Sequence, residues 1–180
     1  MADDIIVIDL ETLDTRPTAA IIAIGAVRFD PTLPDPAFDT FQSLVEVGSA
    51  VQAGTVSGAT LAFWMQQSDQ TRAQFKGERE LRDVLLDLAA WFPSENCQVY
   101  GYGADFDCVI LSHAYRQHDL PVPWKYHNQR CLRTLTALAP SVPFIKATVA
   151  HDALADSLAE AEHLIKLYHH FNIIQKEPQK

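Results

Sequence analysis

Apolar and polar positions in the first quarter of the chain follow the pattern of β-strands. Two nearly uninterrupted apolar runs, residues 4–10 (DIIVIDL) and 20–29 (AIIAIGAVRF), are typical of strands buried on both faces. Gly25, inside the second run, indicates a bulge or a point of close backbone approach. After a proline-rich turn at 31–36, residues 38–47 (FDTFQSLVEV) alternate well enough for a third strand. These runs predict a three-stranded meander.

Helical spacing dominates the rest of the chain. It predicts helices over the ranges 60–68, 78–92, 105–117, 130–138 and 152–171. The second of these helices has an apolar stripe of Leu81, Leu85, Leu88 and Phe92, and the last has one of Leu154, Leu158, Ala161, Ile165 and Tyr168. A short apolar piece at 97–102 predicts a fourth strand, and a brief strand is compatible with the residues before the fourth helix. Strands followed by alternating strands and helices predict a mixed-sheet α/β domain.

Length and composition limit what kind of protein this is. At 180 residues and 20.1 kDa, we expect one domain over residues 1–174 and a frayed polar tail at 175–180 (QKEPQK). Three cysteines without a CxxC pair indicate free thiols in a reducing cytoplasm and argue against structural zinc. No apolar run is long enough to span a bilayer, and the acidic N-terminus lacks the basic start of a signal peptide. We therefore expect a cytoplasmic protein with no membrane partner.

The charge balance separates two kinds of nucleic-acid protein. The formal net charge is −9 and the pI about 5.1. This disfavours a protein that coats nucleic acid with a broad basic surface, because phosphate neutralisation needs Lys and Arg. It leaves open an enzyme whose acids hold metal ions, since a bound cation inverts the local field.

Two acids interrupt the first apolar strand, in the stretch VIDLET. Asp9 and Glu11 are two residues apart, so on a strand their side chains project from the same face. Like charges that close together repel each other unless a cation lies between them. The alternative is that the end of the strand simply emerges into water.

Two further stretches offer acids with ordinary structural explanations. In GYGADFDCVIL, Asp105 and Asp107 both lie where a strand turns into a helix, and either can stabilise the helix N-terminus. In HDALAD, Asp152 is a plausible N-cap, Asp156 lies away from the apolar stripe, and His151 is a loop residue. Local patterns alone do not choose between a cap and a ligand.

Taken together, the acids indicate a metal site. Four carboxylates from a strand, a strand-to-helix turn and a helix can converge on one point, and ligands made only of oxygen suit Mg²⁺ or Mn²⁺. Two such ions about 4 Å apart activate water and stabilise a leaving oxygen in phosphodiester cleavage. A neutral histidine beside that water can accept its proton.

The motifs IDLET, GADFDCVIL and HDALAD, in this order, resemble those of the DEDD superfamily of 3′–5′ exonucleases. The similarity is nearest to the phage-type branch that includes the nuclease domain of exodeoxyribonuclease VIII. The segments that support it are residues 18–31, 60–68, 122–135 and 150–156. The resemblance implies a ribonuclease H-like fold with a mixed five-stranded sheet flanked by helices.

Roles for individual residues follow from the resemblance. It implies that Asp9, Glu11, Asp107 and Asp156 hold two divalent cations, Mg²⁺ or Mn²⁺. The family pattern F-D-x-x-I-L selects Asp107, since Phe106 precedes it. A histidine five residues before the last Asp marks the DEDDh subclass, so His151 is expected to be the general base. Tyr102 and Asp105 depart from the family pattern, which leaves substrate preference open.

The resemblance also suggests substrate contacts. These are Thr12, Leu13, Phe63, Trp64 and Arg133. Leu13 can wedge against a base or pack in the core, and the two aromatic residues can stack on a base or belong to the core. Arg133 can contact phosphate or pair with surplus acids.

The resulting prediction is a metal-dependent 3′–5′ exonuclease acting on a single-stranded or frayed 3′ end. DNA and RNA are equally compatible with the sequence. The resemblance also admits a homodimer, since related small exonucleases are often dimers. Two rival functions are a catalytically inactive module that binds a nucleic-acid 3′ end, and an adaptor whose acids merely coat its surface.

Overall fold

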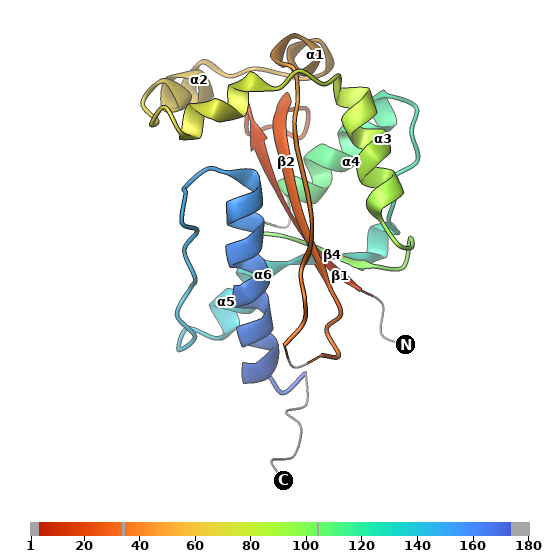
Figure 1. The fold of residues 1–180 in the computed structure, drawn as a ribbon, viewed down its shortest axis with the longest axis vertical. Coiled ribbons are helices and arrows are strands. Elements are labelled where there is room, and N and C mark those ends of the chain that lie inside the picture. The colour runs from red at the N-terminus through yellow and green to blue at the C-terminus, as the bar shows by residue number, and fades with distance from the viewer. Residues whose placement is uncertain (1–3, 34, 104, 174–180) are drawn as a thin grey trace.

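A five-stranded mixed sheet forms the centre of the molecule (Figure 1). The computed structural model describes residues 4–33, 35–103 and 105–173, so the tail expected at 175–180 lies outside the described residues. The strands are β1 (Ile5–Thr12), β2 (Ile21–Phe29), β3 (Asp39–Leu44), β4 (Gln98–Gly101) and β5 (Gln129–Cys131). Their spatial order is β3-β2-β1-β4-β5, with β1, β2 and β3 antiparallel and β4 parallel to both β1 and β5. The predicted meander and α/β class are confirmed.

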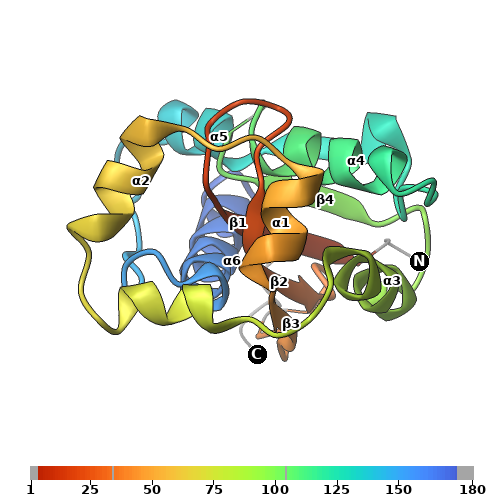
Figure 2. The same ribbon diagram turned by 90° about the horizontal axis from the view of Figure 1, so that it is seen from above.

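Alternate residues of β1 face two separate cores. Ile6 and Ile8 point into a core shared with helices α3 (Leu81–Trp91) and α4 (Asp107–Gln117). Ile5 and Val7 point the other way, into a core shared with α5 (Leu132–Leu138) and α6 (Ala153–His170). Figure 2 shows α6 and α3 on opposite sides of β1 and β2. Both faces of β1 are therefore buried, as its apolar run predicts.

Helices near the middle of the chain differ most from the prediction. The third strand ends at Leu44, and helix α1 (Val47–Ala53) follows because the Glu46 carboxylate accepts hydrogen bonds from the N–H groups of Gly48 and Ser49. Helix α2 spans Gly58–Met65, two residues earlier than expected, because Ser57 caps it. A 3₁₀ helix, η1 (Thr71–Lys76), was not predicted.

The prediction for α3 was three residues too long at its start. Residues 78–80 precede the helix, and Leu81 is its first residue because its N–H donates to the Ser49 hydroxyl of α1 at 2.8 Å. The side chains of Leu81, Leu85 and Leu88 are buried, as the stripe predicts. In the part of the chain that the structure describes, every helix is too short or too polar to cross a bilayer.

The buried face of α6 is rotated from its predicted stripe. Ala161 and Tyr168 are buried as expected, but Leu154, Leu158 and Ile165 are only half-buried. The residues that face the sheet near the start of the helix are instead the small Ala153 and Ser157. Small residues face the sheet because the start of α6 lies very close to it.

Gly25 of β2 makes this close approach possible. A Cβ atom at this position would lie 2.1 Å from the carbonyl oxygen of Ala153, far inside any allowed contact. Gly25 pairs with Asp9 across the β1–β2 ladder. The first turn of α6 therefore lies over the part of β1 that carries the two acids, and the close-approach alternative for Gly25 is confirmed.

Candidate active site

The acids of β1 continue one of its two buried faces. Asp9 and Glu11 follow Ile5 and Val7 at alternate positions, so all four side chains face α6. Glu11 is 7% exposed and Asp9 is half-buried. The register with β2 shifts after Glu11, where the strand approaches its end.

Asp156 joins these acids from the first turn of α6. One carboxylate oxygen from each of Asp9, Glu11 and Asp156 lies within 4.8 Å of the other two. The Asp152 side chain caps the helix by accepting the Ala155 N–H at 3.0 Å, as the sequence predicts. The cap and the contact at Gly25 together fix where Asp156 enters the site.

Asp107 approaches the same place from the other side of β1. It is the first residue of α4, is 3% exposed, and its Oδ1 accepts the N–H of Leu10 at 3.3 Å. A Cβ atom at Gly101 would lie 2.7 Å from its Oδ2, so only glycine leaves room there for the carboxylate. Asp107 lines the same cleft as the other three acids but lies outside the close group that they form. Asp105 is exposed.

Burial and mutual repulsion make these carboxylates hard to ionise. Burial raises the pKa of Asp9 well above its usual value, and the charge of Asp107 adds to the effect. Burial, followed by repulsion from Asp156, raises the pKa of Glu11 to about 8. Burial raises the pKa of Asp107 to about 7, although the backbone N–H of Leu10 opposes the shift. A cation bound among them would remove this cost, so the residues fit a divalent metal ion.

Glu160 is a fifth acid of the site, which the sequence reasoning missed. It lies one helical turn after Asp156, is 6% exposed, and lines the cleft. Burial raises its pKa well above the usual value, and the charges of Asp107 and Asp156 add to this. The four-residue spacing from Asp156 places Glu160 on the same face of the helix, but this spacing does not by itself indicate that Glu160 is buried.

His151 lines the same cleft and has an unusual backbone conformation. Its φ is 59°, in the left-handed region that costs energy for a residue with a Cβ. Its ring packs edge-on against Phe63, with centroids 4.9 Å apart, and more distantly against Trp64 at 6.4 Å. The ring lines the cleft beside Asp156.

Helix η1 holds the loop that carries His151. The Thr71 hydroxyl donates to the carbonyl of Ala150 at 3.3 Å, and the Gln74 amide donates to Asp152 Oδ2 at 2.8 Å. Both η1 side chains are buried. Residues on each side of His151 are thus tied to the same short helix, which explains how a strained conformation persists.

The expected substrate-contact residues fall into different environments. Phe63 is 39% exposed and lines the cleft, whereas Trp64 is 3% exposed and its indole N–H donates to the Thr12 carbonyl at 2.9 Å. Thr12 lines the cleft floor. Leu13 is 2% exposed in the core and does not line the cleft, which favours its packing alternative. Arg133 lines the cleft, with its guanidinium carbon 5.0 Å from the centre of the Tyr102 ring.

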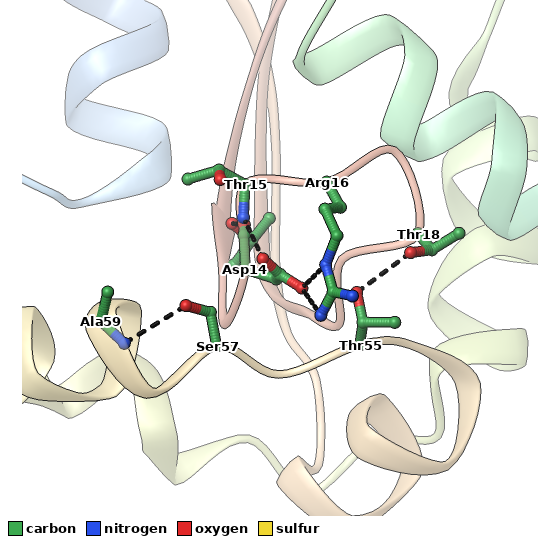
Figure 3. Close-up of polar contacts among 8 residues, drawn as sticks. Asp14, Thr15, Arg16, Thr18, Thr55, Ser57 and Ala59 are labelled. Atoms are coloured by element: carbon green, nitrogen blue, oxygen red, sulfur yellow. Dashed lines mark hydrogen bonds and ion pairs between the residues drawn. The ribbon is translucent and has the colours of Figure 1, made fainter.

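A polar network fixes the loop after β1 at the rim of the cleft (Figure 3). Asp14 accepts the Thr15 N–H at 2.8 Å and the Arg16 guanidinium at 2.5 Å, and these contacts lower its pKa to about 2. The Thr18 and Thr55 hydroxyls are 3.0 Å apart, which ties the loop to the segment before α2. The cleft that the acids, His151 and this loop line has a volume of about 720 Å³, enough for a small ligand or a nucleotide.

The chain is similar to one family of known proteins and to several solved structures. The model of the family described as "3′-5′ exoribonuclease Rv2179c-like domain" matches residues 4–169. No curated protein matches the sequence.

Several solved structures have a similar fold. The nuclease domain of 3′hExo, a DEDDh family member bound to rAMP, aligns over 99% of this chain and 98% of its own, with a TM-score of 0.64 and 15% identity. S. pombe Pop2p in its Mg²⁺- and Mn²⁺-bound form covers 93% of this chain and 84% of its own, with a TM-score of 0.66 and 13% identity. Cell-death related nuclease 4 covers 93% of this chain, with a TM-score of 0.61 and 14% identity, and this chain spans only 64% of its length. The expected ribonuclease H-like fold is confirmed.

Proposed function

The chain belongs to the family of 3′-5′ exoribonuclease Rv2179c-like domains, and from this premise we propose that it is a metal-dependent 3′–5′ exonuclease with a histidine general base. The observation that carries the proposal is the meeting of three carboxylates within 4.8 Å in a cleft that His151 and Asp107 also line. A site of this kind is suited to phosphodiester hydrolysis.

The four acids predicted from sequence, Asp9, Glu11, Asp107 and Asp156, would hold two divalent cations, Mg²⁺ or Mn²⁺. Their donor set contains only oxygen, which suits these hard cations. When bound, the cations supply an activated water and stabilise the charge on the leaving oxygen. Strand β1 contributes rigidity, because Asp9 and Glu11 are fixed by the hydrogen-bonded ladder with β2.

His151 would accept a proton from the attacking water on a ring nitrogen. As the water oxygen bonds to phosphorus, the bond to the 3′ oxygen of the preceding nucleotide breaks. The products are a nucleoside 5′-monophosphate and a chain one nucleotide shorter with a free 3′-hydroxyl. The edge-on contact with Phe63 and the anchoring of the loop by η1 would hold the imidazole in place for this role.

The substrate would enter as a single-stranded or frayed 3′ end. The exposed ring of Phe63 is available to a base, and Arg133, which lines the same cleft, is available to a phosphate. RNA is the favoured substrate, because the family is described as an exoribonuclease family. Kinship with the exodeoxyribonuclease VIII branch, action on DNA, a homodimer and a cytoplasmic location stay predictions from the sequence.

Matched RNA and DNA oligonucleotides, labelled at either end, test the proposal. With Mg²⁺ or Mn²⁺ we expect mononucleotides released from the 3′ end, and chelation should abolish their release. Asp107→Ala and His151→Ala should each lower turnover by about 10²–10⁴-fold. Asp83→Ala is the matched control, since Asp83 is an exposed acid on α3 that does not line the cleft. Undiminished turnover in the first two variants contradicts the assignment.

The two rival functions give different results in the same experiment. An inactive binding module would retain oligonucleotides without any metal-dependent turnover. An adaptor would show no rise in melting temperature with Mn²⁺, whereas ion binding to the folded state must raise it.

A further inference from the structure

Glu160 is an acid for which the proposed mechanism has no use. It is 6% exposed, deep in the cleft, and no donor among the described residues reaches its Oε2. Leaving a buried carboxylate oxygen without a partner is costly. Two further buried acids, Asp107 and Asp14, accept the N–H groups of Leu10 and Thr15. The Oε2 atom of Glu160 is therefore a buried hydrogen-bond acceptor with no donor among the described residues.

The position of Glu160 divides the acids into two groups around Asp9. Glu11 and Asp156 form the close group with Asp9, in which one carboxylate oxygen from each residue lies within 4.8 Å of the other two. Asp107 and Glu160 line the same cleft, are 3% and 6% exposed, and lie outside that close group. After burial, the charge of Asp107 and then that of Glu160 raise the pKa of Asp9 most, and Asp107 likewise raises the pKa of Glu160. Asp9 therefore has Glu11 and Asp156 as close neighbours, and it also interacts with Asp107 and Glu160.

Helix geometry explains how one element serves both groups. Asp156 and Glu160 are four residues apart on α6, so their side chains lie on the same face of the helix, about 6 Å apart along its axis. The positive charge of Arg133 opposes the rise that burial causes in the pKa of both Glu160 and Asp107. Arg133 remains exposed and packs over Tyr102, so it does not neutralise the pair.

From this arrangement we propose that Glu160 belongs to the half of the site that holds the second divalent cation, together with Asp9 and Asp107. The inference rests on the proposed function, because it presupposes two ions. Glu160 would bind this cation directly or through one of its waters, which hard cations such as Mg²⁺ usually keep. The first cation, among Asp9, Glu11 and Asp156, would not depend on it.

Calorimetric titration with Mn²⁺ tests the role of Glu160 without using activity. The wild-type chain should bind two ions of unequal affinity. Glu160→Gln keeps the shape of the side chain but removes its charge, and it should weaken the second ion by about 10–100-fold while leaving the first unchanged. Glu162→Gln is the matched control, an exposed acid two residues further along the same helix. It should titrate like the wild-type protein.

The thermal stability of the metal-free protein provides a second readout. Glu160→Gln replaces a buried carboxyl group that is costly to ionise with a neutral amide, so its melting temperature without metal should not fall, while the rise produced by Mn²⁺ should shrink. If Glu160→Gln fails to fold, Glu160→Asp, which keeps the charge on a shorter side chain, should still show a weakened second ion.

The outcomes separate this inference from the proposed function. Two ions bound with unchanged affinities in Glu160→Gln, in a protein whose wild type is an active nuclease, would refute the role of Glu160 alone. A wild-type chain that binds no Mn²⁺ would refute both proposals.

Discussion

Gly25→Ala is expected to separate Asp156 from the acids of β1. The new Cβ would lie 2.1 Å from the Ala153 carbonyl oxygen, whereas real Cβ atoms essentially never come closer than 3.0 Å. To move from 2.1 to 3.0 Å, the start of α6 must retreat from β2 by about 0.9 Å. Both contact partners are backbone at this point, so no flexible side chain can absorb the change.

The shift should affect stability and turnover to different extents. Overpacking of this kind costs about 1–3 kcal/mol of unfolding free energy. Because Asp156 lies three residues after Ala153, it moves with the helix, and a displacement of about 1 Å at a catalytic group can cost about 100-fold in rate. Mn²⁺ affinity should fall as well, since Asp156 leaves the group of three close carboxylates.

The assays are urea denaturation, calorimetric Mn²⁺ titration and release of nucleotides from a labelled RNA. Gly58→Ala in α2 is the matched control, because a Cβ there meets nothing within 4 Å. The control should keep wild-type stability and turnover. The reasoning is refuted if Gly25→Ala behaves like Gly58→Ala in all three measurements.

Three further predictions concern the same cleft. Because burial raises the pKa of Glu11 to about 8 and of Asp107 to about 7, the folded metal-free protein keeps protons that the unfolded chain has released by pH 5. The melting temperature of the metal-free protein should therefore fall as the pH rises from 5 to 8, and saturating Mn²⁺ should reverse this trend. A metal-free melting temperature that does not change with pH would contradict the raised pKa values. Gln74→Ala loosens the loop of His151 and should lower kcat by about tenfold with little change in KM, and an effect on KM alone would argue against this role. Trp64→Phe removes the indole donor to the end of β1 and should cost about 1 kcal/mol in urea denaturation, so an unchanged midpoint would count against that bond.

The sequence predicted the parts of the molecule whose pattern is local. Strands β1 and β2 are long apolar runs, and a period of two was enough to place Asp9 and Glu11 on one face. Helices α1 and η1 were missed because they are short and depend on contacts with distant residues. The Ser49 hydroxyl of α1 accepts the Leu81 N–H, and Thr71 of η1 donates to the Ala150 carbonyl. Contacts between residues so far apart in the chain produce no periodic pattern in the sequence.

Glu160 was missed for a different reason. On α6 it lies among apolar and small residues, and a glutamate on a long helix is usually a solvated surface acid. Its burial becomes evident only when the helix is rotated so that Ala153 and Ser157, rather than Leu154 and Leu158, face the sheet. That rotation follows from the contact at β2, which the helix sequence alone does not contain.

Two glycines on the strands that flank β1 explain how acids from three elements can meet. On one side, Gly25 pairs with Asp9 and lets α6 approach with Asp156; on the other, Gly101 leaves the room that Asp107 occupies at the start of α4. At Gly25 a Cβ would meet the backbone of Ala153 at the start of α6, and at Gly101 it would meet the side chain of Asp107 itself. The motif residues supply the charges, and the absence of a Cβ at these two positions allows the carboxylates to come close together. A variant that keeps every acid but fills either position should therefore bind Mn²⁺ more weakly in a calorimetric titration.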